Sequence, residues 1–88
     1  MWQVKIKRRL ERKISSLPER VQNLYQALKR DLTCDGPVQP SWNNYSKIGA
    51  DEHHCHLTYH YVACWRVLSD NSLELEVYYV GSRENAPY

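Results

Sequence analysis

Most histidines of this sequence lie in one short segment, and their spacing could support proton transfer. Side chains on a strand alternate between its two faces. One face of an extended segment here would carry His54, His56, Thr58 and His60. The segment therefore predicts a strand face that could transfer protons. The alternative is that single histidines are ordinary surface residues of the strand, and this interpretation suits His53 and His60 best.

The same segment raises the alternative of a metal site, because a cysteine lies among the histidines. On a strand, however, Cys55 would point away from His54 and His56, so one ion could bind no more than two of these side chains from one face. A zinc site would need further ligands nearby, namely His60, Asp51 or Glu52. The chain has no Cys-x-x-Cys pair. We therefore predict no metal site and no cofactor.

Positive charge is concentrated in the first part of the chain. Residues 1–31 contain nine Lys or Arg against three acids, whereas residues 32–88 contain three basic residues and seven acids. A basic surface of this kind favours phosphate or an acidic partner. The alternative is that the cations form only the solvated face of a helix. The candidate phosphate-binding residues are Lys5, Lys7, Arg8, Arg9, Arg12 and Lys13, and Lys47 is the single cation of a later loop.

The elements that position these residues begin with a strand and two helices. Residues 2–7 alternate between apolar and polar side chains, which predicts a half-buried strand. From Arg8 an apolar stripe of helical period runs to Leu17, and Pro18 must stop this helix or start the next. A clearer stripe over residues 21–32 predicts the second helix, which ends at Asp35-Gly36-Pro37. These stripes are expected to pack in the core.

The second half of the chain reads as a loop followed by strands. Residues 37–51 have a loop composition. The histidine-rich strand follows, then a strand at residues 61–68, a turn at residues 69–72 and a last alternating strand from Leu73 to Tyr79. Residues 57–61 contain no turn-forming Gly, Pro, Asn or Asp, so this connection is either a tight turn near Tyr59-His60 or one long bent strand.

This order predicts one α+β domain over residues 1–88. An N-terminal strand, a helical hairpin and a three-strand antiparallel meander would pack with the helices on one face of the sheet. No apolar run reaches the roughly 20 residues that a membrane span requires, so no membrane association is expected. The odd number of cysteines and the absence of a signal-like N-terminal segment lead us to expect a cytoplasmic protein.

The order of elements, together with three sequence features, resembles the RelE/ParE superfamily of small toxins from bacterial type II toxin–antitoxin systems. The features are the strand at residues 61–67, the stretch Val77-Tyr78-Tyr79-Val80-Gly81-Ser82-Arg83-Glu84 and the final Tyr88. The likeness covers nearly the whole chain. It is most specific at the strand that leads into Gly-x-Arg-Glu and the Tyr that follows shortly after.

This resemblance implies an mRNA endoribonuclease that needs no metal and that a cognate antitoxin keeps inactive. In such a reaction the ribose 2′-oxygen attacks the adjacent phosphate, which requires a base, a cation for the developing charge and an acid for the leaving 5′-oxygen. The Arg of the family motif matches Arg83, which would stabilise the phosphate. The Tyr near the C-terminus matches Tyr88, which could act on the proton or stack on a base.

The sequence departs from RelE itself at the catalytic strand. Two Lys of RelE at alternating positions match His54 and His56 here, and an Arg at the start of the next strand is replaced by Val62. The histidines make this chain more similar to the HigB and YafQ branches. Because neutral histidine can act as a base near pH 7, His56 is the first choice for the base and His54 the second.

Two other functions stay open at this stage. The ParE branch shares the fold and binds DNA gyrase without cleaving RNA, and an inactive relative could bind only its antitoxin or operator DNA. For the nuclease, the expected partners are the antitoxin, the ribosome and mRNA, with operator DNA bound only through the toxin–antitoxin complex. The basic first half of the chain would then contact ribosomal RNA phosphates.

Overall fold

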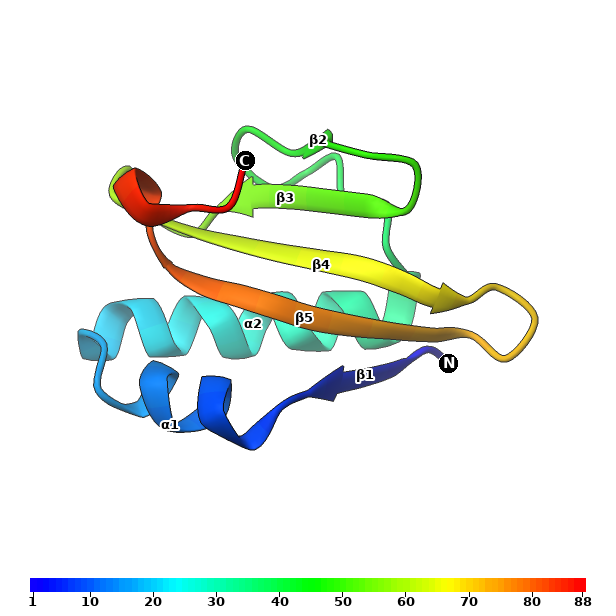
Figure 1. Ribbon diagram of the computed structural model, residues 1–88, viewed down its shortest axis with the longest axis horizontal. Coiled ribbons are helices and arrows are strands. Elements are labelled where there is room, and N and C mark those ends of the chain that lie inside the picture. The colour runs from blue at the N-terminus through cyan, green and yellow to red at the C-terminus, as the bar shows by residue number, and fades with distance from the viewer.

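A five-stranded sheet with the order β1-β5-β4-β3-β2 forms the centre of the molecule (Figure 1). A computed structural model describes the whole chain, Met1–Tyr88. The strands are β1 (Gln3–Ile6), β2 (Ser46–Lys47), β3 (Glu52–His56), β4 (Tyr61–Ser69) and β5 (Glu74–Ser82). The helical elements are α1 (Arg8–Ser15), α2 (Glu19–Asp35) and a 3-10 turn, η1 (Arg83–Asn85).

The sheet is mixed, because β1 runs parallel to β5 while all other neighbours are antiparallel. The first and last strands of the chain are thus side by side in the sheet. The predicted α+β order of strand, helical hairpin and antiparallel meander is confirmed. The structure adds the short strand β2, which lies inside the segment that was predicted to be a loop and pairs with the histidine-rich strand β3.

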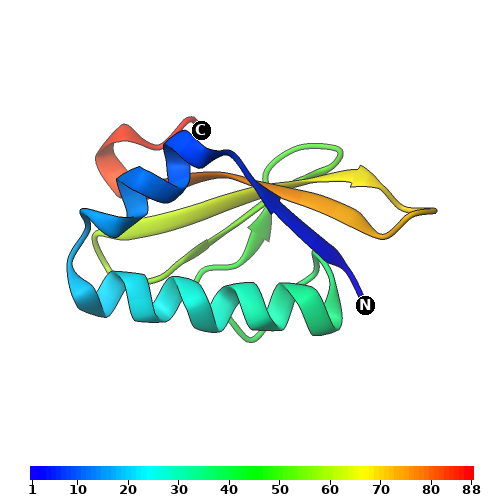
Figure 2. The same cartoon turned by 90° about the horizontal axis from the view of Figure 1, so that it is seen from below.

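The long helix α2 runs along one face of the sheet, and α1 packs next to it beside β5 (Figure 2). Leu28 and Leu32 of α2 are fully buried in a core that also contains Trp65 of β4 and Leu75 of β5. The apolar stripes predicted for the helices therefore do pack in the core. We call the opposite side of the sheet, which α2 does not cover, the open face.

Proline and glycine set the limits of α2. Pro18 is the residue before the first helical position and lacks an amide hydrogen, so the break between the helices costs no hydrogen bond. At the other end Gly36 has a φ of +86°, and a Cβ atom there would lie 2.6 Å from the indole nitrogen of Trp2. Only glycine fits this position without strain. The close approach allows Trp2 to pack against the end of the helix.

A tight turn joins β3 to β4, although the segment has no Gly, Pro, Asn or Asp. The amides of Leu57 and Thr58 donate to the carbonyl of Tyr61, at 2.8 and 3.2 Å. The Thr58 hydroxyl accepts from the amides of His60 and Tyr61, at 3.3 and 3.2 Å. Thr58 thus provides the side-chain cap that Asn or Asp often provides. The prediction that Thr58 and His60 share the strand face of His54 is wrong, because both lie in this turn.

An irregularity in β5 changes which residues face the core. Trp65 pairs with Val77 and Cys64 pairs with Tyr79, so Tyr78 is an extra residue without a partner on β4. Such a bulge reverses the alternation of the residues that follow it. Val77 remains in the core and Val80 joins it, while Tyr79 turns to the open face. The predicted alternation, which placed Tyr79 with Val77, fails at this point.

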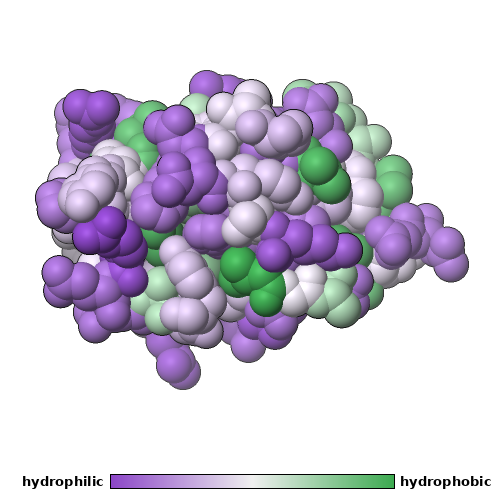
Figure 3. Space-filling model, turned by 90° about the horizontal axis from the view of Figure 1, so that it is seen from above, coloured by the Kyte–Doolittle hydropathy of each residue, from purple (hydrophilic) through white to green (hydrophobic).

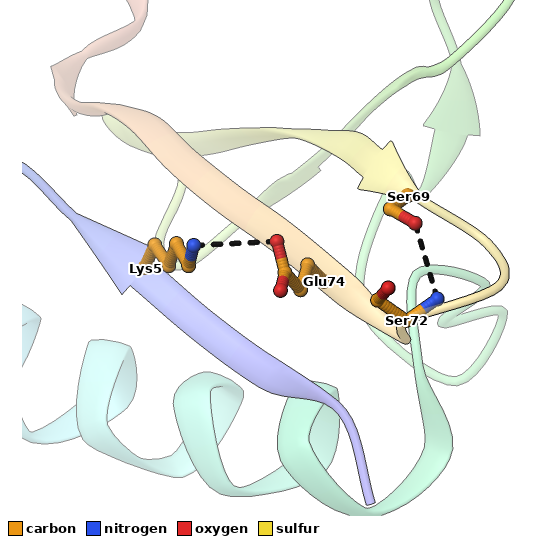
Figure 4. A network of polar contacts seen from close by, with 4 residues as sticks. All are labelled: Lys5, Ser69, Ser72 and Glu74. Atoms are coloured by element: carbon orange, nitrogen blue, oxygen red, sulfur yellow. Dashed lines mark hydrogen bonds and ion pairs between the residues drawn. The ribbon is translucent and has the colours of Figure 1, made fainter.

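The hairpin between β4 and β5 turns at residues 70–73, one residue later than the predicted turn at residues 69–72. The amide of Ser72 donates to the hydroxyl of Ser69 at 3.1 Å (Figure 4). In the same view Lys5 of β1 reaches across to Glu74 at the start of β5, with 3.2 Å between Nζ and Oε1. This contact ties the two parallel strands together at their exposed end.

Candidate active site on the open face

The open face is organised in rows that cross β3, β4 and β5. His54 lies opposite Cys64, which lies opposite Tyr79. The next row contains His56, Val62 and Gly81. Directly paired residues of neighbouring strands place their side chains side by side on the same face. The sheet therefore provides a fixed floor on which His54 and His56 are adjacent, with 5.8 Å between their ring centres.

His54 is held from two sides. Its Nδ1 lies 3.1 Å from the hydroxyl of Ser46 on β2. Its ring lies 4.6 Å from the ring of Tyr88, measured between centres, and only 7% of the residue is exposed. The short strand β2 therefore orients the imidazole, while the C-terminal tail covers it. No protein group binds Nε2 of this ring.

His56 lies at the end of β3 and is more accessible. The backbone amide of His56 donates to the carbonyl of Asn43 at 2.8 Å, which anchors the strand end to the preceding loop. Burial lowers the pKa of His56 below its ordinary value, and the electrostatic effects of His54 and Arg83 lower it further. At neutral pH the imidazole of His56 is therefore uncharged and able to accept a proton.

Arg83 begins the 3-10 turn that follows β5. The backbone amide of Arg83 donates to the carbonyl of His60 at 2.7 Å, which connects the tail to the β3–β4 turn. The guanidinium carbon lies 4.4 Å from the ring centre of Tyr59. Arginine stacks well on aromatic rings while its N–H groups remain free for an anion. The turn residue Tyr59 thus orients the cation next to His56.

Tyr88 closes the site from the C-terminal tail. Burial and the neighbouring Cys64 raise the pKa of Tyr88 above its ordinary value, whereas Arg83 opposes this shift. The phenol is therefore protonated at neutral pH and can donate a hydrogen bond. The structure brings together all four residues that were predicted as catalytic. They come from β3, η1 and the C-terminal tail, and they are His54, His56, Arg83 and Tyr88.

Gly81 of the Gly-x-Arg motif makes room for a side chain of the open face. A Cβ atom at Gly81 would lie 2.9 Å from the hydroxyl of Tyr79. This hydroxyl donates to the carbonyl of Ser82 at 2.7 Å. The ring of Tyr79 therefore lies across the backbone just before Arg83 and braces the start of the tail.

The basic residues predicted to bind RNA fall into separate groups. Lys7, Arg9 and Lys13 line one groove between α1 and the open face. Arg8 and Arg12 are exposed on α1 but do not line this groove. Lys5 forms the ion pair with Glu74 described above. The remaining cation, Lys47, lies on β2 at the opposite edge of the sheet.

His53 differs from the expectation of a surface residue. It is 4% exposed, and Trp65 stacks on its ring with 6.0 Å between centres. Nδ1 of His53 lies 2.7 Å from the hydroxyl of Tyr45. Burial lowers the pKa of His53, so a neutral ring fits this environment. The tertiary structure thus gives His53 a role in the core on the side of α2.

Sequence reasoning missed three residues of the open face: Arg66, Tyr78 and Tyr79. Arg66 lies on the same face of β4 as Cys64, in a row with Glu52 and Glu76. Strand alternation predicts this place for Arg66, because it lies two residues after Cys64. Strand alternation likewise places Tyr78 on the face of Glu76, whereas the position of Tyr79 depends on the bulge and has no signal in the sequence.

The remaining surface does not add a second cluster of reactive groups. No set of three or more His, Cys, Asp or Glu side chains lies close enough together to hold one metal ion.

None of the helices is both apolar and long enough to span a bilayer. Seen from the β2 side, the surface is mainly hydrophilic, and its hydrophobic residues form scattered spots (Figure 3).

Comparison with known proteins identifies the fold. The sequence matches no protein-family model and no curated protein sequence. The structure is similar to RelE in the archaeal RelE–RelB complex of Pyrococcus horikoshii, with a TM-score of 0.74, 15% identity and coverage of 97% of this chain and 98% of that chain. A chain of the YoeB–YefM complex of Staphylococcus aureus matches with a TM-score of 0.70, 7% identity and coverage of 94% and 98%.

A metal-bound toxin from Helicobacter pylori also matches, with a TM-score of 0.67, 16% identity and coverage of 96% of this chain and 97% of that chain. The matches run over almost the full length of each chain, although few residues are identical. The chain therefore has the fold of the RelE-like toxins, as the sequence resemblance predicted.

Proposed function

We propose that this protein is the toxin of a type II toxin–antitoxin pair and that it is an endoribonuclease. It cleaves mRNA in the ribosome without a metal ion and thereby inhibits translation in the cytoplasm. The observation that supports this proposal most directly is the cluster on the open face. Two histidines, an arginine and a tyrosine meet there on a RelE-like fold, although they are separated in sequence.

The reaction assigned to this cluster is an intramolecular transesterification of the RNA strand. The ribose 2′-oxygen loses its proton and forms a bond to the adjacent phosphorus, and the bond from phosphorus to the 5′-oxygen breaks. The products are a 2′,3′-cyclic phosphate and a free 5′-hydroxyl. The step needs a proton acceptor, a proton donor and a stabilising charge, and it needs no redox partner.

His56 is the base in this proposal. Its lowered pKa keeps the ring neutral at physiological pH, and it is less covered than His54. His54 is covered by Tyr88 and fixed by Ser46, which suits a positioning role beside the base. Its unoccupied Nε2 could bind a ribose hydroxyl or a phosphate oxygen.

Arg83 and Tyr88 complete the proposed chemistry. The guanidinium of Arg83 stabilises the charge that develops on the phosphate oxygens, since several N–H donors remain after it stacks on Tyr59. Tyr88 is protonated at neutral pH and can deliver a proton to the leaving 5′-oxygen or stack on a base. Val62, which replaces the arginine of RelE, is fully buried and adds no cation.

The proposed partners follow from this function. A cognate antitoxin neutralises the toxin, and the toxin reaches operator DNA only within the toxin–antitoxin complex. The exposed basic residues Arg8 and Arg12, on the outer side of α1, are proposed contacts for ribosomal RNA. Lys47 at the other edge of the sheet is a further proposed contact for RNA phosphates.

A primer-extension experiment tests the activity. The toxin is expressed from a tightly controlled promoter, together with a reporter message and a copy of that message without a start codon. The proposal predicts new 5′ ends in the translated message and none in the untranslated copy. Cuts in both copies would show a nuclease that does not need the ribosome. Intact messages with arrested replication would favour gyrase as the target instead.

Single substitutions test the residue assignments in the same assay. His56→Ala, Arg83→Ala and Tyr88→Phe are each expected to reduce the new 5′ ends strongly. His60→Ala is the matched control, because His60 is an exposed histidine in the turn next to the site. Growth arrest that survives all three substitutions would contradict the catalytic assignment and favour a binding function.

A further inference from the structure

A groove of about 560 Å³ lies between α1 and the open face, outside the histidine cluster. One wall consists of Lys7, Arg9 and Lys13, from the end of β1 and from α1. The floor includes Arg66 of β4 and Tyr78 and Tyr79 of β5. Four cations thus face one carboxylate, that of Glu76, so the groove is strongly electropositive.

Arg66 is held in place on the floor of this groove. Its guanidinium carbon lies 4.0 Å from the ring centre of Tyr78. The hydroxyl of Tyr78 in turn donates to Oε1 of Glu52 at 2.6 Å, which fixes the ring. Nε of Arg66 is buried and has no hydrogen-bond partner, and its ion pair with Glu76 is 3.7 Å long. The arginine is therefore ordered by stacking, and 42% of its side chain is exposed, so its terminal N–H groups can reach a ligand in the groove.

Tyr79 connects the groove with the proposed active site. Nζ of Lys13 lies 5.3 Å from the ring centre of Tyr79, and the hydroxyl is fixed by Ser82. Tyr79 is in the same row as Cys64 and His54. Arg66 is the diagonal cross-strand neighbour of His54, a relationship that separates Cα atoms by about 7–8 Å. One continuous ligand can therefore contact both regions.

We propose that this groove binds the sugar–phosphate backbone of the single-stranded RNA substrate on one side of the cleavage position. Lys7, Arg9 and Lys13 contact successive phosphates from the wall. Arg66, supported by the ring of Tyr78, contacts a phosphate from the floor, and a base can pack against the partly exposed ring of Tyr79. This inference rests on the proposed function, and it assigns a substrate-binding role to Arg66, Tyr78 and Tyr79.

The groove fits an RNA strand better than an acidic peptide because of its two kinds of surface. Cations beside partly exposed aromatic rings are the usual composition of sites for single-stranded nucleic acid. The groove also includes Tyr79, which lies in the row of His54, and the proposed base His56 lies in the next row. A carboxylate-rich peptide would bind the cations but would not need to extend from the groove to the histidine cluster.

A binding assay with an RNA that cannot be cleaved tests the inference separately from catalysis. The probe is a fluorescent single-stranded oligonucleotide with 2′-O-methyl groups on all riboses, which removes the nucleophile but keeps phosphates and bases. Fluorescence anisotropy gives the affinity of the full-length toxin, purified away from its antitoxin, over a range of salt concentrations. The variants are Arg66→Gln and Lys13→Gln. The matched controls are Arg20→Gln and Arg30→Gln, which remove the same charge from exposed positions of α2.

We expect each groove variant to bind roughly tenfold more weakly at low salt, the loss of one charged hydrogen bond. Each should also reduce the slope of log affinity against log salt by about 0.7, which is the contribution of one phosphate contact on a single strand. A role of Arg66 in folding alone would not change this slope. The control variants should keep both the affinity and the slope of the wild type.

Three results would overturn the inference. These are no measurable binding by the wild type, equal losses in the groove and control variants, or groove variants that bind RNA normally but bind the antitoxin weakly. The last result would identify the groove as a site for an acidic protein segment. Failure of the proposed nuclease function has a different signature, namely normal groove-dependent RNA binding without cleavage of any message.

Discussion

His53 and His54 are neighbours in the sequence but belong to two different environments. His53 faces α2, where it stacks on Trp65 and bonds to Tyr45. His54 faces the other way, where it meets Ser46 and Tyr88. Both rings are almost fully buried, so burial by itself does not separate a structural histidine from a functional one. The difference lies in their neighbours, which are core side chains for His53 and the candidate catalytic residues His56 and Tyr88 for His54.

On the side of α2, polar groups are mostly consumed within the protein. Tyr45 and His53 satisfy each other, and the indole nitrogen of Trp65 donates to the carbonyl of Pro37 at 2.9 Å. Tyr25 is an exception, because its buried hydroxyl has no partner. Burial, together with the charge of Glu11, raises the pKa of Tyr25 to about 12, so the phenol remains neutral.

On the open face, several donors and acceptors remain available. Nε2 of His54 and the guanidinium of Arg83 have no hydrogen-bonding partner in the protein, and 42% of the Arg66 side chain is exposed. The two buried thiols do not belong to this reactive set, because burial raises the pKa of Cys55 and of Cys64 to about 12. Unused polar groups on an ordered floor are what a ligand requires, and the open face places several of them together.

The largest expected effect is on the free energy of unfolding, and it distinguishes a buried core residue from an exposed residue near the site. Trp65→Ala removes the largest fully buried side chain and should reduce the free energy of unfolding by about 3–5 kcal/mol. Folded proteins have a free energy of unfolding of only about 5–15 kcal/mol, so this substitution would remove a large share of the stability. Tyr59→Ala, at a residue that is 68% exposed, should change it by about 0.5 kcal/mol or less. Urea titration followed by circular dichroism measures both values.

A matched pair of histidine substitutions tests the comparison directly. His56→Ala should reduce the cleavage rate by about 10²–10⁴-fold, the usual contribution of a general base, and should change stability little. His53→Ala should reduce the free energy of unfolding by roughly 1–3 kcal/mol, because it leaves the Tyr45 hydroxyl unpaired. Its cleavage rate per folded molecule should match the wild type. Single-turnover cleavage measures the first effect and urea titration the second. Normal cleavage by His56→Ala together with loss of cleavage by folded His53→Ala would contradict the assignment.

The pH dependence of cleavage gives a smaller effect with a defined sign. A base must be unprotonated, so the rate should fall as the pH falls through the pKa of His56. Because burial and the charges of His54 and Arg83 lower this pKa, the midpoint should lie below the ordinary value of 6.5. Arg83→Gln removes one of these charges and should move the midpoint to higher pH, besides lowering the rate. A midpoint that stays in place in the pH–rate profile would argue against His56 as the base.

The smallest effect is expected at the exposed end of the sheet. The Lys5–Glu74 ion pair is 3.2 Å long, and its side chains are 47% and 30% exposed. Water and salt screen such pairs, so a double-mutant cycle with Lys5→Gln and Glu74→Gln should give a coupling of about 0.2–1 kcal/mol. The coupling should decrease as salt is added. A larger value would mean that this pair, rather than the core, holds β1 against β5.

Local sequence patterns were sufficient for the main elements but not for the two-residue strand β2. The alternation of residues 2–7 predicts β1, and the helical stripe around Leu28 predicts α2, since a buried face imposes its period on the sequence. Pairing partners were not predictable in this way. Nothing in residues 2–7 specifies that β1 runs parallel to β5, because strand pairing depends on contacts between distant segments.

The four proposed catalytic residues were named from the sequence because a family motif and strand alternation pointed to them. Their proximity was not derivable from the sequence, since it depends on the tail that folds back over His54. The wrong expectations have similar causes. The turn at Thr58 uses a side-chain cap, and the bulge at Tyr78 inserts one unpaired residue, so each shifts the faces of the residues that follow.

The sequence alone determined the order of elements, the apolar stripes of the helices and the types of side chain available for chemistry. These depend on local period and composition, which each segment carries by itself. Only the tertiary structure decided that His53 is part of the core while His54 and His56 lie on the open face, with the tail over His54. It also placed Arg66 beside Tyr78, because the bulge and the strand order are set by packing of the whole sheet.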